Sequence, residues 1–286
     1  MNSIRDTYTL VNGVQIPCLG YGTYKAAEGN DEAVIKMAID AGYRLFDTAS
    51  FYQTETYLAS AIKKSGLLRE EFFLTSKVWK TEMGYDYAKE AFNRTLENLQ
   101  TDYLDLYLIH WPIIEVGYEK WEELIADTWR AMEELYREEK IRAIGLSNFL
   151  PHHIEALLRT ATIKPMVNQL EIHPGYTQEA AVNYCKNHNM LVQAWSPIGR
   201  TRVLKDPLIL SLAHKYQVSP AQICLRYELQ KEILPLPKSS SFERMKENQD
   251  IFSFVISVED MYRIDTMPQA GWSGEHPDRE REKITN

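Results

Sequence analysis

Cysteine is scarce in this sequence of 286 residues: there are three, an odd number, and they lie far apart. Cys18, Cys185 and Cys224 show no paired spacing, which argues against a disulfide framework and against a cysteine-ligated zinc site. Isolated cysteines of this kind are typical of a reducing compartment. We therefore expect a cytoplasmic protein.

Long apolar runs are also missing. The longest, Leu106–Ile109 within Tyr103–Pro112, is far shorter than the ~20 residues that a helix needs to cross a bilayer. The N-terminal segment Met1–Asn12 carries Arg5 and Asp6 and lacks the apolar centre of a secretory signal. We expect neither export nor a membrane partner.

Basic residues are outnumbered: 32 Lys and Arg face 40 Asp and Glu, so the formal net charge is -8. Nucleic acids select for clustered Lys and Arg, and we do not expect them as partners. The 44% of hydrophobic residues is typical of a globular chain that buries a large core. With no linker-like or repetitive stretch, residues 1–286 are expected to form one domain. Neither a coiled-coil seam nor an obvious sticky face is present, so we expect a monomer or a weak dimer.

Apolar runs of strand length alternate with amphipathic ones. The runs are apolar almost throughout, as expected for parallel strands covered on both faces. Between them, segments such as Ala88–Leu99 and Trp121–Leu135 repeat apolar residues at intervals of three and four, which predicts helices. A short strand at Cys18–Gly20 brings the total to about eight units, typical of a closed (β/α)8 TIM barrel. The other predicted strands are Tyr43–Asp47, Phe72–Lys77, Leu104–His110, Ala143–Ser147, Met166–Glu171, Leu191–Trp195 and Ile233–Leu236.

Turn and cap signals add detail to the barrel. Asn12-Gly13 within Tyr8–Ile16 predicts an N-terminal β-hairpin with a type I′ turn, which we expect to close the bottom of the barrel. Asn30 and Gly42 are predicted to cap a helix over Asp31–Ala41. A helix and a tail are expected to follow the last strand.

An open, doubly wound sheet is the alternative fold. It usually binds a dinucleotide at three spaced glycines between the first strand and the first helix. Here Gly20-Tyr-Gly22 is followed by no third glycine before a helix. The sequence therefore favours the barrel.

Four ionisable residues follow the predicted strands. Asp47, Lys77 and His110 each end one strand, and Tyr52 lies in the loop after Asp47. Taken singly, each has an ordinary structural role, such as a helix cap or a buried histidine. Together they indicate an active site, because a barrel brings the carboxyl ends of its strands to one rim.

This set of side chains suits proton donation to a carbonyl oxygen. A free tyrosine, with a pKa of about 10, is a poor acid at neutral pH. We expect the Lys77 ammonium to lower the pKa of Tyr52, and the Asp47 carboxylate to keep buried Lys77 charged. Neutral His110 is expected to donate a hydrogen bond to the same carbonyl oxygen and orient it.

Other chemistries lack their usual motifs. The sequence contains no His-Glu-x-x-His, no Gly-x-Ser-x-Gly and no Gly-x-x-x-x-Gly-Lys-Ser/Thr, so the hydride for a reduction must come from a cofactor. The segment 236–241 follows the last strand, where barrels bind phosphate. Lys238 and Arg244 add charge that suits a second, ribose-linked phosphate, which favours NADPH over NADH. The ordinary alternative is a capped, solvated helix start.

Six ordered motifs between about Gly20 and Asn248 resemble the signatures of the aldo-keto reductases. The resemblance implies a (β/α)8 barrel that binds NADP(H) in extended form. It implies Tyr52 as the acid, Asp47 and Lys77 as its partners and His110 as the orienting donor. The motifs are Gly42–Tyr52, Thr75–Trp79, Asp105–Pro112, Gly145–Phe149, Asn168–Pro174 and Pro237–Ser239.

The resemblance also implies the remaining site residues. Ser147, Asn148 and Gln169 are expected to hold the nicotinamide carboxamide. Trp195 offers a stacking face where many members of the family have a tyrosine. The other expected cofactor contacts are Thr23, Asp47, Ser196, Lys238, Ser239, Arg244, Glu247 and Asn248. The expected walls of the substrate pocket are Tyr24, Phe51, Trp79, Trp111 and Trp272 of the tail, with Tyr24 replacing a tryptophan common in the family.

The sequence thus predicts an NADPH-dependent reductase of aldehydes or ketones, either sugar-derived or small and apolar. Its partner is a small carbonyl substrate, and no metal is expected. One alternative is a non-catalytic NADP(H)-binding subunit that senses redox state, as the potassium-channel β subunits of this family do. Another is a metal-assisted barrel hydrolase that uses Asp47, His110 and Glu171.

Overall fold

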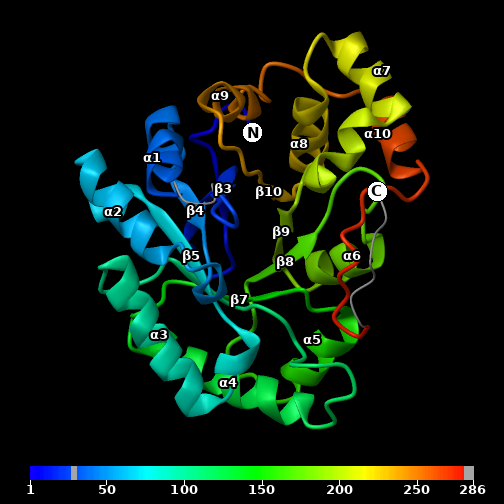
Figure 1. Ribbon diagram of the computed structural model, residues 1–286. Helices are drawn as coiled ribbons and strands as arrows, with labels where there is room; N and C mark the ends of the chain where they lie inside the picture. The colour runs from blue at the N-terminus through cyan, green and yellow to red at the C-terminus, as the bar shows by residue number, and fades with distance from the viewer. Residues whose placement is uncertain (27–30, 280–286) are drawn as a thin grey trace.

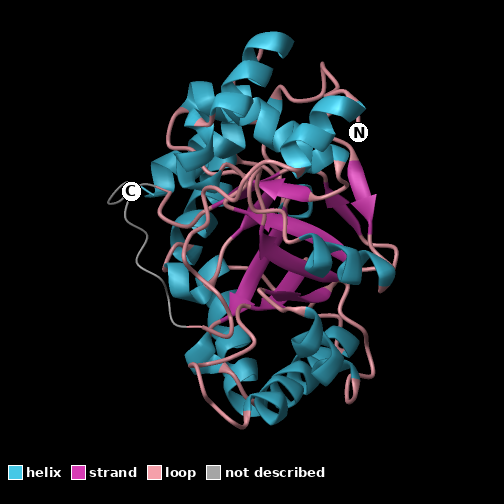
Figure 2. Ribbon diagram, turned by 90° about the vertical axis from the view of Figure 1, so that its right-hand side faces the viewer, coloured by secondary structure: helices cyan, strands magenta, loops and turns pink. Residues whose placement is uncertain are grey.

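The computed structural model describes residues 1–26 and 31–279. Within them, eight parallel strands curl into a barrel with helices around the outside, which confirms the predicted TIM barrel (Figures 1 and 2). Neighbouring strands follow chain order from the first to the last. They are β3 (Gly20–Gly22), β4 (Leu45–Asp47), β5 (Phe73–Val78), β6 (Leu106–Ile109), β7 (Ile144–Ser147), β8 (Val167–Glu171), β9 (Leu191–Trp195) and β10 (Leu234–Leu236).

The barrel closes between β3 and β10. The Gly22 amide donates to the Pro237 carbonyl at 3.1 Å. A Cβ on Gly20 would lie 2.5 Å from a methyl carbon of Leu236, so a larger residue would force this buried side chain to shift. The first strand begins later than the predicted Cys18–Gly20 because the Cys18 amide bonds back to the Asp6 carbonyl at 2.9 Å.

Helices cover the outer face of the sheet. The predicted apolar stripes are buried: Phe92 and Trp129 are at most 1% exposed. After β9, a 3-10 segment, η4 (Gly199–Lys205), and two helices precede β10, where one helix was predicted. The helices are α1 (Asp31–Ala41), α2 (Glu55–Ser65), α3 (Tyr85–Leu99), α4 (Trp121–Arg137), α5 (Pro151–Leu158), α6 (Glu179–Asn187), α7 (Pro207–Tyr216), α8 (Pro220–Gln230), α9 (Phe242–Gln249) and α10 (Val258–Asp265).

Helix α1 has its predicted bounds, and the predicted C-terminal cap Gly42 follows it with a φ of 110°. The predicted N-terminal cap Asn30 lies outside the described residues. The expectation of a single domain over residues 1–286 stays a prediction. No helix in the described part of the chain combines the length and apolar character of a membrane span.

The N-terminal hairpin pairs β1 (Thr7–Thr9) with β2 (Gln15–Pro17). The predicted type I′ turn is wrong, because such a turn needs positive φ at both central residues and here only Gly13, at 87°, has it. The Leu10 amide donates to the Val14 carbonyl at 2.9 Å, so three residues, not two, form the loop. A longer loop places a single glycine in the left-handed region.

The hairpin does cross the bottom of the barrel. The Asn12 side chain donates to the Arg142 carbonyl at 2.9 Å, just before β7 begins. The contact spans the amino-terminal ends of the strands, from before β3 to β7. The opposite rim, at the carboxyl ends, is left to the loops that carry the candidate site.

Candidate active site

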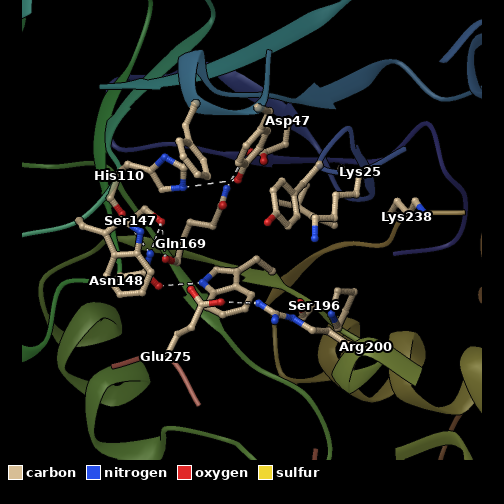
Figure 3. Close-up of a pocket in the computed structure, with 18 of the residues that line it drawn as sticks. Lys25, Asp47, His110, Ser147, Asn148, Gln169, Ser196, Arg200, Lys238 and Glu275 are labelled. Atoms are coloured by element: carbon tan, nitrogen blue, oxygen red, sulfur yellow. Dashed lines mark hydrogen bonds and ion pairs between the residues drawn. The ribbon is translucent and has the colours of Figure 1, made fainter. Parts of the chain in front are cut away.

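A cavity of about 440 Å³ lies at the carboxyl ends of the strands. Asp47 at the end of β4, His110 directly after β6 and Trp195 at the end of β9 line it. Tyr52 reaches it from the short segment η1 (Ser50–Tyr52). Figure 3 shows Asp47 and His110 pointing into one space together with other labelled side chains such as Gln169. This is the rim at which TIM-barrel enzymes carry their active sites.

The structure brings the four predicted catalytic residues together. The Lys77 ammonium lies 2.6 Å from an Asp47 carboxylate oxygen and 3.4 Å from the Tyr52 hydroxyl. The Tyr52 hydroxyl lies 3.5 Å from Nε2 of His110. Lys77 is fully buried and stands behind Tyr52, outside the cavity lining. The phenol is thus the member of the Lys77–Tyr52 pair that faces the cavity.

The pKa of Tyr52 differs from the sequence-based expectation. It lies well above the ordinary value of 10, because burial penalises the phenolate and the Asp47 carboxylate repels it. The expected lowering by Lys77 is therefore wrong. Asp47, only 2.6 Å from the ammonium, opposes its effect on the phenol, and burial is the largest cause of the rise. For Lys77 itself, burial lowers the pKa and Asp47 opposes that effect, as expected.

His110 is held in its neutral form. Burial lowers its pKa well below 6.5, and the nearby charges of Lys77 and Lys80 act in the same direction. Among the described residues, Nδ1 of His110 has no hydrogen-bond partner, whereas Nε2 faces the Tyr52 hydroxyl. An Nε2–H donor would point into the cavity beside the phenol.

Amide side chains form the wall next to this group. The Asn148 amide donates to the His110 carbonyl at 3.0 Å, and its oxygen accepts from the Trp195 indole at 2.8 Å. The Gln169 amide donates to Asp47 at 2.8 Å, and Ser147 donates to the Gln169 carbonyl at 3.1 Å. Of the three predicted carboxamide contacts, Gln169 therefore bonds directly to Asp47, and Ser147 bonds to Gln169.

Positive charge gathers at the other end of the cavity. Figure 3 shows Lys25 and Lys238 on the side away from His110, with Arg200 below them. Lys238 was predicted from the sequence, whereas Lys25 and Arg200 were not. Both have a positive φ, 50° at Lys25 and 52° at Arg200 within η4, and neither directly follows a predicted strand or belongs to a motif that would have drawn attention to it in the sequence.

Some predicted cofactor residues lie outside the cavity lining. Buried Thr23 donates to the Asp47 carbonyl at 3.1 Å, behind the wall. Ser241 caps α9 by accepting from the Arg244 amide, so the capped helix start proposed as the ordinary alternative is present. Ser196 does line the cavity. The other predicted residues that do not line it are Ser239, Arg244, Glu247 and Asn248.

Aromatic rings form the outer part of the cavity. Tyr24, Phe51, Trp79 and Trp111 line it, and the Phe51 and Trp79 rings stack with centroids 3.9 Å apart. Trp272 does not reach the cavity. Its ring stacks on Tyr176, with centroids 6.0 Å apart.

Glu171 holds the C-terminal tail in place through Ser273. Both oxygens of this buried carboxylate accept from Ser273, from its amide at 2.9 Å and its hydroxyl at 2.6 Å. With Ser273 fixed in this way, Glu275 becomes the tail residue that lines the cavity. Sequence reasoning did not single out Glu275.

The metal-site alternative finds no support in the geometry. Within the described ranges, the one group of three residues close enough to share a metal is His152, His153 and Asp278, and not Asp47, His110 and Glu171. Even there, the Leu150 amide donates to Nδ1 of His153 at 3.1 Å, so the proton of the neutral ring sits on Nε2. That nitrogen lies 2.8 Å from an Asp278 oxygen, and while it carries a proton it cannot ligate a metal.

Comparisons with known proteins identify the family of this chain. The family model for the aldo/keto reductase family matches residues 18–268. The chain is 47% identical to a glyoxal reductase of Bacillus subtilis, over 96% of this chain and 98% of that protein. It is 41% identical to a 9,11-endoperoxide prostaglandin H2 reductase of Trypanosoma cruzi, over 97% of each. A solved aldo/keto reductase of Brucella melitensis superimposes with a TM-score of 0.84 at 40% identity, covering 90% of this chain and 97% of that one. The chain therefore belongs to the aldo-keto reductase family, whose members are carbonyl oxidoreductases that generally use a nicotinamide cofactor.

Proposed function

We propose that this protein reduces aldehydes and ketones with NADPH and that Tyr52 is the proton donor. One observation supports this most directly: the Tyr52 hydroxyl faces the cavity within 3.5 Å of both Lys77 and His110. The similarity to a glyoxal reductase favours small carbonyl substrates. When bound, NADPH would supply the hydride for this reduction.

The side chains of this protein control the oxygen end of the carbonyl. Tyr52 and Nε2 of neutral His110 both donate hydrogen bonds to it, which fixes its position and stabilises the negative charge that develops there. The raised pKa keeps Tyr52 protonated until that charge appears. The Tyr52 proton then moves to the oxygen, because an alkoxide is more basic than a phenolate. Lys77 stabilises the phenolate that remains, and Tyr52 regains a proton from solvent.

The residues around the cavity fit a nicotinamide dinucleotide. Amide groups lie at the catalytic end and cations at the other, which matches a carboxamide at one end and phosphates at the other. We propose that Ser147, Asn148 and Gln169 hold the carboxamide and that Trp195 stacks on the ring. The adenosine end and its 2′-phosphate would extend past the cavity toward α9. The proposed contacts of the adenosine end are Lys238, Ser239, Arg244, Glu247 and Asn248, and Ser196 is a proposed contact inside the cavity. Thr23 supports the cavity wall from behind.

The test follows the oxidation of NADPH at 340 nm with glyoxal, methylglyoxal, benzaldehydes and simple ketones. We expect the wild type to consume NADPH with several aldehydes. The variant Tyr52→Phe should lose nearly all turnover yet bind NADPH with unchanged affinity, measured by fluorescence. Tyr57→Phe, on exposed surface of α2, is the matched control. The absence of NADPH oxidation with every carbonyl would contradict the proposed function, and wild-type turnover by Tyr52→Phe would contradict the acid assignment.

A further inference from the structure

Gln193 is a buried polar residue that the proposed mechanism does not involve. It stands in the middle of β9, is fully buried and does not line the cavity. In the register of the sheet it pairs with Gln169 of β8, so the two side chains lie on the same face. Burying an amide is unfavourable unless hydrogen bonds replace its contacts with water. The partner of Gln193 therefore indicates its role.

That partner is the Gln169 side chain, which joins Gln193 to the Asp47 carboxylate. The Gln169 amide nitrogen donates to Oε1 of Gln193 at 2.9 Å and to Oδ2 of Asp47 at 2.8 Å. An amide nitrogen carries two hydrogens, so these two bonds use both. The other carboxylate oxygen of Asp47 accepts from Lys77 at 2.6 Å. Gln193 thus ends a chain of hydrogen bonds that begins at Lys77.

These bonds determine which end of the Gln169 amide faces a ligand. Both acceptors would repel the amide oxygen, so the amide cannot turn round without losing two hydrogen bonds. Asp47 fixes one N–H and Gln193 fixes the other, which also sets the plane of the amide. Because Gln169 lines the cavity, its oxygen is the atom that remains to accept from a carboxamide.

The main chain of Gln169 is held independently of Gln193. Its carbonyl accepts from the Ser147 hydroxyl at 3.1 Å and from the Asn148 amide at 2.8 Å. Gln193 therefore acts on the side chain of Gln169 alone.

The orientation of Gln193 is costly for the protein. Among the described residues, its buried Nε2 has no hydrogen-bond partner. Turning this amide round would place its nitrogen against the Gln169 nitrogen, donor against donor. An unpaired buried donor calls for an explanation other than packing, and the bond to Gln169 at the opposite end of the same amide supplies one.

We propose that Gln193 is a positioning residue for the nicotinamide. By accepting the second N–H of Gln169, it directs the Gln169 oxygen toward the carboxamide. This inference rests on the proposed function, in which Gln169 contacts the carboxamide. Without the acceptor, one N–H of Gln169 is buried unpaired and the amide turns in search of another partner.

The test compares NADP⁺ with 2′-phospho-ADP-ribose, which has the same adenosine end but no nicotinamide. The measured quantity is the dissociation constant of 2′-phospho-ADP-ribose divided by that of NADP⁺, from calorimetry. We expect Gln193→Met, which is similar in size but lacks the acceptor, to lower this ratio about fivefold. Gln193→Asn, whose amide is one carbon short, should also lower it, and Gln193→Glu, which keeps an acceptor oxygen, should not.

Gln222→Met is the matched control. Gln222 of α8 is also buried, and its amide donates to the Asp250 carbonyl at 2.6 Å, away from the cavity. This substitution should lower the urea midpoint and leave the ratio unchanged. A wild-type ratio in both Gln193→Met and Gln193→Asn overturns the proposal. So does a fall in Gln222→Met or Gln193→Glu as large as that in Gln193→Met.

A second measurement separates this inference from the proposed function. In the protein without nucleotide, the losses in urea midpoint of Gln169→Met and Gln193→Met are compared with that of the double variant. The double variant should lose less than the sum, because either substitution alone already removes the bond. If the wild type binds neither nucleotide, the proposed function fails, while this comparison still decides whether Gln193 holds Gln169. Additive losses reject the positioning role.

Discussion

Arg200 and Glu275 form an ion pair across the cavity, with a guanidinium nitrogen 2.8 Å from a carboxylate oxygen (Figure 3). One comes from η4 after β9, the other from the tail. The Arg200 guanidinium also lies 5.7 Å from the Trp195 ring centre. The ion pair thus connects η4, close to Trp195, to the tail. Glu171 holds that tail through Ser273.

This pair also acts on the proposed acid, with opposite effects from its two members. Glu275 raises the pKa of Tyr52 and Arg200 lowers it. We expect Glu275→Gln to lower the pH at which alcohol oxidation, which needs the phenolate, becomes fast, and Arg200→Gln to raise it. The measurement is the pH profile of kcat for oxidation in both variants, with Glu119→Gln as an exposed control. Shifts in the same direction for both variants would be inconsistent with this electrostatic coupling.

The pH dependence of carbonyl reduction should lack a histidine step. Because the pKa of His110 lies well below 6.5, the ring is neutral at every pH above that lowered value, and protonation costs activity only at more acidic pH. The raised pKa of Tyr52 moves the loss of the proton donor to strongly alkaline pH. We therefore expect kcat/KM to be flat between about pH 6 and 9. An inflection near 6.5 that persists with several substrates would show that His110 titrates normally.

The preference for NADPH should depend on Arg244. This exposed side chain stands in the first turn of α9, next to Ser241 at the helix start. If it contacts the 2′-phosphate, Arg244→Ala weakens NADPH binding about tenfold or more and leaves NADH binding nearly unchanged. Dissociation constants for both cofactors provide the measurement, and Lys246→Ala on the same helix provides the control. Equal losses for the two cofactors would remove the 2′-phosphate contact from the proposal.

The stability of the fold should respond to pH through Glu228. This residue of α8 is fully buried, and neither carboxylate oxygen has a hydrogen-bond partner among the described residues. Burial raises its pKa well above 4.5, so the native state favours the protonated form. As pH rises above the unfolded pKa, the free energy of unfolding falls until the native carboxyl also ionises.

Glu228→Gln removes this titration. We expect the variant to gain stability relative to the wild type between pH 5 and pH 8, measured as the difference in urea midpoint at the two pH values. Glu259→Gln, which is exposed on α10, should show no comparable change. A difference between Glu228→Gln and the wild type that stays constant from pH 5 to pH 8 would show that the native pKa of Glu228 is not raised above its unfolded value.

The sequence by itself determined the barrel and the position of its four central residues. Asp47 and His110 adjoin strands so uniformly apolar that both faces had to be covered, and parallel strands covered in this way bring their carboxyl ends to one rim. Which polar residue follows each apolar run can be seen directly in neighbouring positions of the sequence. A reader of the sequence can therefore place Asp47, Lys77 and His110 together without knowing how any loop runs.

Only the tertiary structure decided the features that depend on loop paths and on burial. Arg200 and Glu275 are 75 residues apart, and nothing in either segment specifies the other. Trp272 and Glu275 are both in the tail, and it is the contact of Ser273 with Glu171 that determines which one reaches the cavity. The pKa of Tyr52 rises although an ammonium lies 3.4 Å away, because burial and Asp47 outweigh it. Such properties are sums over distant groups in three dimensions, which a linear pattern of residue types does not contain.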